Sequence, residues 1–95
     1  MARIILPYKT ENRLTDLLYL EQSRRVAQSQ GKSKPTLGML EKEVASHCRI
    51  TADNVRLIRR NRTQPSLPVA MKIAEYINVP VEEIFHFIEN PDYKG

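Results

Sequence analysis

Apolar residues recur at helical spacing along most of the chain, in segments separated by Gly, Pro, Asn and basic turns. Segment 36–48 shows this most clearly, because its apolar positions are spaced i, i+3, i+7, i+8 and i+11. These positions are Leu37, Leu40, Val44, Ala45 and Cys48. Thr36 stands where its hydroxyl can cap the first turn. The pattern predicts an amphipathic helix with one face in a hydrophobic core.

The same patterning predicts four further helices, so the chain is expected to be an all-α protein with five helices. The first begins at Glu11 or Asn12, and the expected ranges are 11–30, 36–48, 51–60, 66–78 and 81–88. Gly31 ends the first helix and opens the GKSKP loop. Thr51 and Ser66 are N-caps of the third and fourth helices. Asn78 closes the fourth.

The opening segment ARIILPY, from Ala2 to Tyr8, is β-like and stops at Pro7. A short N-terminal strand or arm is expected there. The chain of 95 residues is expected to form one domain. The expected parts are an arm or strand over 1–10, a helical domain over 11–90 and a tail over 91–95. A core of this size is thin, so dimerisation would add buried surface.

Positive charge is concentrated in one part of the sequence. The chain carries a net charge of +4 with a pI near 9.5. Residues 49–62 hold 5 basic and 1 acidic side chains, whereas residues 63–95 hold 2 basic and 5 acidic ones. A basic segment followed by an acidic one is typical of a protein that presents one face to a polyanion.

The sequence also favours a cytoplasmic protein without a cofactor or metal. No apolar run approaches the roughly 18 residues needed to cross a bilayer, and no signal peptide is recognisable. The single cysteine, Cys48, fits a reducing compartment and lies in the apolar stripe, so it is expected in the core. Cys48, His47 and His86 lack the paired spacings of a zinc site. No catalytic motif is present, so an enzyme is not expected.

Segments 36–48 and 51–60 predict a helix-turn-helix, because only Arg49 and Ile50 separate two short helices. The second helix of such a pair fits the major groove of DNA, which is about 12 Å wide. Val55 and Ile58 are expected to face the core. The side chains left pointing outward or sideways are Ala52, Asp53, Asn54, Arg56, Leu57 and Arg60.

From about residue 40 to residue 88 the chain resembles the helix-turn-helix domain of the Cro and phage-repressor type, also called the XRE-like family. The matching positions are Val44-Ala45, Thr51, Val55, Ile58, Arg60-Asn61-Arg62, Pro65-Ser66, Lys72-Ile73-Ala74 and Val81 through Phe85. The resemblance implies a lambda-repressor-like fold that binds double-stranded DNA.

The resemblance also implies two sets of site residues. Those at the start of the recognition helix would read base edges: Thr51, Ala52, Asp53, Asn54, Arg56 and Leu57. Those at its end and in the following turn would contact phosphate: Arg59, Arg60, Asn61, Arg62, Thr63 and Gln64. Side-chain chemistry agrees independently, since guanidinium groups match phosphate oxygens and the guanine edge, and Asn pairs with adenine.

The sequence departs from the family pattern at several positions. Leu40-Glu41 replaces a Thr-Gln pair whose amide reaches a phosphate in similar proteins. Arg49 and Asn61 stand where glycines are usual, and a left-handed Arg49 would cost roughly 1 kcal/mol. Arg59 occupies a common glutamate position and adds charge there. The first helix and the GKSKP loop are longer than usual.

Two functions are weighed. The first is a sequence-specific transcriptional regulator, a repressor that binds an inverted repeat as a homodimer. The second is a protein-interaction module on the same fold, such as an antitoxin whose partner is a toxin, or an adaptor. Two segments are equal candidates for the dimer interface: the ARIILPY arm, and the last helix with Ile84, Phe87 and Ile88.

Overall fold

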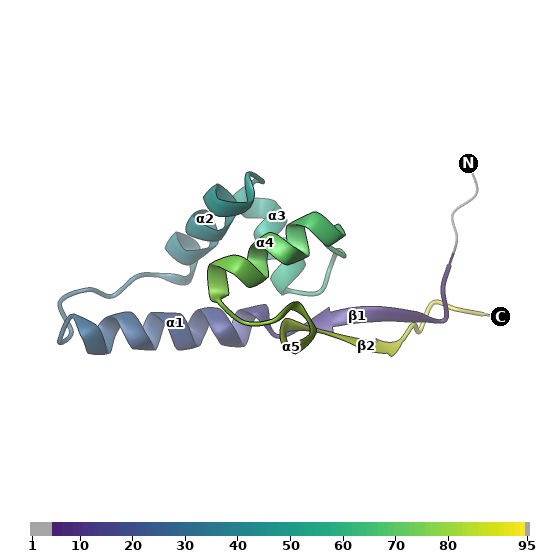
Figure 1. Ribbon diagram of the computed structural model, residues 1–95, viewed down its shortest axis with the longest axis horizontal. Helices are drawn as coiled ribbons and strands as arrows, with labels where there is room; N and C mark the ends of the chain where they lie inside the picture. The colour runs from purple at the N-terminus through teal and green to yellow at the C-terminus, as the bar shows by residue number, and fades with distance from the viewer. Residues whose placement is uncertain (1–4, 95) are drawn as a thin grey trace.

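The computed structural model describes residues 5–94, which form a mostly helical protein with a small two-stranded sheet (Figure 1). In chain order the elements are β1 (Tyr8–Asn12), α1 (Leu14–Gln28), α2 (Leu37–Cys48), α3 (Ala52–Arg59), α4 (Leu67–Ile77), α5 (Val81–Ile84) and β2 (Phe85–Glu89). The molecule is elongated, with extents of 53 × 22 × 19 Å. Helix α1 and the sheet follow the long axis, and α2, α3 and α4 are grouped on one side of them (Figure 1).

The predicted N-caps are confirmed. The hydroxyls of Thr36, Thr51 and Ser66 each accept a hydrogen bond from the backbone N–H three residues later, at 3.1 to 3.4 Å. Helices α2 and α4 end at Arg49 and Asn78, which have left-handed φ values of 58° and 60°. Asn tolerates this conformation better than Arg does, so Arg49 carries the larger strain.

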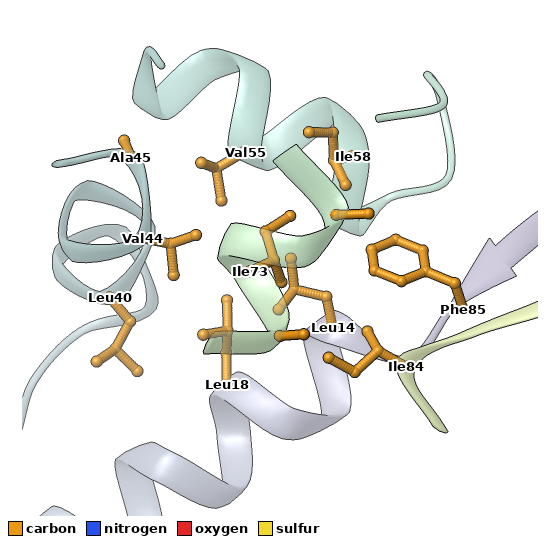
Figure 2. Close-up of a cluster of buried hydrophobic side chains, with 12 residues drawn as sticks. Leu14, Leu18, Leu40, Val44, Ala45, Val55, Ile58, Ile73, Ile84 and Phe85 are labelled. Atoms are coloured by element: carbon orange, nitrogen blue, oxygen red, sulfur yellow. The ribbon is translucent and has the colours of Figure 1, made fainter. Parts of the chain in front are cut away.

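One hydrophobic core holds the helices and the base of the sheet together (Figure 2). Its buried side chains are Leu14, Leu18, Leu40, Val44, Ala45, Val55, Ile58, Ala70, Ile73, Ala74, Ile84 and Phe85. Cys48 packs against this cluster, as the apolar stripe predicted. Every helix contributes to the core, so the orientation of α3 is fixed by its packing on α2 and by the burial of Val55 and Ile58 in this core.

The structure corrects the two ends of the predicted all-α fold. The first helix begins at Leu14, because residues 8–12 form β1 instead of a first helical turn. The last helix ends at Ile84, and residues 85–89 form β2. The N-terminal strand was predicted too early: it follows Pro7 rather than stopping there. Residues 1–4, part of that prediction, lie outside the described residues.

Pairing between distant segments explains these errors. Strands β1 and β2 are antiparallel, with Tyr8 opposite Glu89 and Asn12 opposite Phe85. The backbone N–H of Arg13 donates to the carbonyl of Ile84 at 2.9 Å, which continues the contact into the helices. Each strand is short and finds its partner more than 70 residues away, so a local pattern cannot reveal it.

Candidate nucleic-acid interface

Helix α3 lies with one side in the core and the other in solvent. Arg49, Ile50 and Thr51 connect α2 to α3. The N–H of Ile50 donates to the carbonyl of Ala45 at 3.0 Å, which fixes this connection to the end of α2. Val55 is fully buried and Ile58 is nearly so, as the sequence predicted. Two short helices joined by three residues are therefore held in a fixed relation, and the solvent-facing side of α3 is presented by a rigid support.

The six residues predicted to read bases do not all lie on that side. Thr51, Asp53, Asn54 and Leu57 are exposed, and the Asp53 side chain is 85% exposed. Ala52 and Arg56 are half-buried. The Thr51 hydroxyl is already occupied as the N-cap of α3. The outer surface of α3 thus offers one amide, one apolar side chain and the Asp53 carboxylate, which accepts a hydrogen bond from Arg56 at 3.1 Å.

Two of the arginines are held by a buried glutamate of α2. The Nε of Arg59 donates to Oε2 of Glu41 at 2.5 Å, and an Nη of Arg56 donates to Oε1 at 3.1 Å. The Glu41 side chain is only 2% exposed and that of Arg59 only 11%. Arg59 also donates to the hydroxyl of Thr15 at 3.4 Å. The prediction that Arg59 contacts phosphate is therefore not supported, because its guanidinium faces inward.

The position of Glu41 accounts for two residues that depart from the pattern of the Cro-type domains that the sequence resembles. Glu41 replaces an amide, Arg59 replaces a carboxylate, and the two side chains form an ion pair between α2 and α3. Burial acts to raise the pKa of Glu41, but the hydrogen bonds and charges of Arg59 and Arg56 outweigh it and lower the pKa. Glu41 consequently stays ionised, and Arg59 balances charge rather than adding to it.

Two further residues predicted to contact phosphate anchor the sheet instead. Oδ1 of Asn61 accepts from the backbone N–H of Asn12 at 2.9 Å and from its Nδ2 at 3.0 Å. Oε1 of Gln64 accepts from the N–H of Thr10 at 3.1 Å, and Nε2 of Gln64 donates to the Thr10 carbonyl at 2.9 Å. The Asn61 and Gln64 side chains thus bond to the backbone groups of β1 that a further strand would otherwise pair with. Asn61 also takes a left-handed φ of 59°, as expected where a glycine is usual.

Arg60, Arg62 and Thr63 remain as an exposed basic turn at the end of α3. Within residues 5–94, no ion pair involves Arg60 or Arg62. Arg62 also lines a groove between this turn and the sheet, together with Thr10 and Phe87. The turn therefore carries positive charge that no internal carboxylate offsets.

Sequence reasoning missed the role of Glu41 and a second polar network. In that network Arg25 of α1 donates to both carboxylate oxygens of Glu43 at 2.7 Å, and the Tyr76 hydroxyl of α4 donates to Glu43 at 2.7 Å. Burial and the contact with Glu43 raise the pKa of Tyr76 to about 12. In the sequence, Glu41 and Glu43 are simply glutamates beside the apolar stripe of α2. A helix with a solvent-exposed polar face would show the same pattern.

Among the described residues no cluster of His, Cys, Asp and Glu could hold a metal ion. His47 contacts Glu75 at 3.0 Å, and burial raises the pKa of the Cys48 thiol. No helix in the part of the chain that the structure covers is long and apolar enough to cross a membrane.

Comparisons with known proteins do not assign this chain to a family. A scan of protein-family models gave no match, and a search of curated proteins gave none either. The likeness to Cro-type domains therefore stays a prediction from the motifs.

Proposed function

We propose that this protein is a sequence-specific regulator that binds double-stranded DNA as a homodimer on an inverted repeat and acts as a repressor. The observation that carries the proposal is the exposed side of α3, followed directly by the exposed arginines of the 60–63 turn. An α-helix fits the major groove, and guanidinium groups bind phosphate at its edges.

The proposed roles follow the exposure of each side chain. Asn54 and Asp53 would pair with adenine and with the cytosine amino group, and Leu57 would contact a thymine methyl. Arg60 and Arg62 would contact phosphates on the strands flanking the groove. Arg59 has a positioning role, because it fixes α3 through Glu41.

Salt dependence tests the phosphate contacts. For Arg60→Ala/Arg62→Ala, binding should weaken on all duplexes alike, and the slope of log affinity against log salt should fall by about 0.9 for each lost contact. Lys32→Ala/Lys34→Ala is the matched control, because it removes the same charge from exposed lysines in the GKSKP loop. Fluorescence anisotropy on one labelled duplex measures both. Equal slopes for the two double variants would refute the assignment of the basic turn.

Selection from a random DNA pool tests base reading. The wild-type protein should enrich two half-sites about one helical turn, roughly 34 Å, apart. Asn54→Gln and Asp53→Asn should enrich different half-sites, while Ser46→Ala on the exposed surface of α2 should leave the motif unchanged. Identical motifs for the wild type and both α3 variants would exclude these residues as readers.

Exposed apolar side chains on α4 favour the alternative, a protein-interaction module such as an antitoxin or adaptor. Leu67 is 69% exposed and Met71 is 56% exposed, and the two lie one turn apart. Adjacent exposed apolar side chains are typical of a surface that contacts another protein. An electrophoretic mobility shift on random duplex with excess competitor separates the two functions, since an adaptor should give no complex that resists competition.

A further inference from the structure

The sheet has two edges, and only one of them is closed. On β1, Gln64 bonds to the N–H and carbonyl of Thr10, and Asn61 bonds to the N–H of Asn12. These bonds cover the edge of β1 that faces the basic turn. In Figure 1, β2 lies on the other side of β1, away from α4. The edge of β2 therefore faces outward from the helices.

The register shows which backbone groups lie on that outer edge. Residues in an antiparallel pair alternate between exchanging hydrogen bonds and not exchanging them. Thr10 directs its N–H to Gln64, so the Thr10–Phe87 pair is one that does not exchange them. Phe87, and by alternation Glu89, must direct N–H and C=O away from β1. Among the described residues, no other segment bonds to these groups.

Two aromatic side chains of the sheet, one on each strand, are exposed. Phe87 is 74% exposed and Tyr8 is 49% exposed, and their rings meet edge-to-face with centroids 5.6 Å apart. A two-stranded sheet is marginal in water by itself, and natural proteins cover or charge long apolar edges. Here the five-residue strand β2 carries only one formal charge, that of Glu89.

We propose that β2 pairs with β2 of a second copy of this chain, so that a four-stranded antiparallel sheet joins two protomers about a twofold axis at Phe87. The strand is complementary to itself in this register. The N–H and C=O of Phe87 would bond to Phe87 of the other copy, and the N–H of Glu89 would bond to the carbonyl of Phe85. The N–H of Phe85 is not needed, because it already bonds to Val81.

This geometry suits the proposed function but does not depend on it. Because paired strands are antiparallel, the two helical bodies lie at opposite ends of the shared sheet, separated by at least the strand length of about 17 Å. The twofold axis is perpendicular to the sheet, so the basic turns, which flank β1 in each copy, lie at the two outer edges of the four-stranded sheet. The proposal deepens the proposed homodimer by giving its interface, and it is tested without DNA.

Proline variants test the edge directly. Phe87→Pro removes an N–H that points outward, so no bond of the β1–β2 ladder is lost. Its control, Phe87→Ala, loses the ring but keeps the N–H. Glu89→Pro and Glu89→Ala form a second pair that keeps the ring. Molar mass by light scattering at about 100 μM should be twice 11.0 kDa for the wild type, and each proline variant should dissociate about 10- to 100-fold more readily than its alanine control.

Amide hydrogen exchange of the wild type makes the test independent of the variants. The N–H groups of Phe87 and Glu89 should become more protected as protein concentration rises, whereas the amide of Arg62, which bonds to the Leu57 carbonyl within one protomer, should not change with concentration. A wild type that is monomeric at this concentration would overturn the proposal. So would a dimer whose dissociation constant is the same in the proline and alanine variants, or whose β2 amides show no protection. A Phe87→Pro protein that is monomeric where Phe87→Ala is dimeric would support the interface whether or not either variant binds DNA, so the interface and the DNA-binding proposal can fail separately.

Discussion

Replacing Glu41 with glutamine should destabilise the protein severely, although the side chain keeps its size. The carboxylate is 2% exposed and receives the guanidinium of Arg59 at 2.5 Å, and Arg59 is itself 11% exposed. Neutralising Glu41 leaves Arg59 buried without a counter-charge. Breaking a buried ion pair in this way costs about 3 kcal/mol or more. For a domain of this size, a loss of about 3 kcal/mol lowers the melting temperature by roughly 12 to 24 °C.

Thermal and urea unfolding followed by circular dichroism measure this loss. Glu82→Gln is the control, because Glu82 is an exposed glutamate in the first turn of α5 and its neutralisation should cost less than about 1 kcal/mol. The double variant Glu41→Met/Arg59→Met should be more stable than Glu41→Gln, since it removes both charges. The reasoning would be refuted by a Glu41→Gln protein as stable as Glu82→Gln, or by a double variant no better than the single one.

Three other predictions concern the supporting contacts. Asn61→Gly keeps the left-handed turn but removes the acceptor for Asn12, so unfolding free energy should fall by about 1 to 2 kcal/mol in urea titrations; an unchanged midpoint would contradict this role. The pKa values of Glu41 and Glu43 are lowered in the folded protein. Their contribution to the free energy of unfolding should therefore be complete above the unfolded-state pKa near 4.5 and be lost as pH falls through the folded-state pKa. An unfolding free energy that stays constant down to a pH of about 2 would argue against both ion pairs. An ultraviolet titration should contain a tyrosine component near pH 12 that disappears in Tyr76→Phe; its persistence would exclude Tyr76 as the source.

The helical part of the fold could be predicted because its signals are local. The caps at Thr36, Thr51 and Ser66 and the inward positions of α3 each depend on residues within about one or two turns. The strands could not be predicted, since β1 and β2 are stabilised by one another across the whole chain. A run such as Phe85–Ile88 fits the end of an amphipathic helix as well as a strand, and only the partner decides.

The sequence predicted the residue types of the candidate site but not the direction in which each side chain points. An arginine and an amide are chemically suited to phosphate wherever they stand, so the segment 59–64 looked uniform. The fold divides it: Arg59 turns toward Glu41, Asn61 and Gln64 turn toward β1, and Arg60 and Arg62 stay in solvent. Which way each side chain points depends on tertiary partners that are 18 to 54 residues away in sequence.

In the arginine-rich segment, some guanidinium groups form ion pairs inside the protein and others are exposed to solvent. Were all of its guanidinium groups in solvent, their mutual repulsion would oppose folding of a short helix, and many rotamers would have to be ordered on binding. Glu41 removes this difficulty by holding Arg59 and the less buried Arg56 against α2. The orientation of α3 is then set before any ligand arrives. Under the proposed function, Arg60 and Arg62 supply attraction that is independent of sequence, while the fixed helix supplies the selectivity.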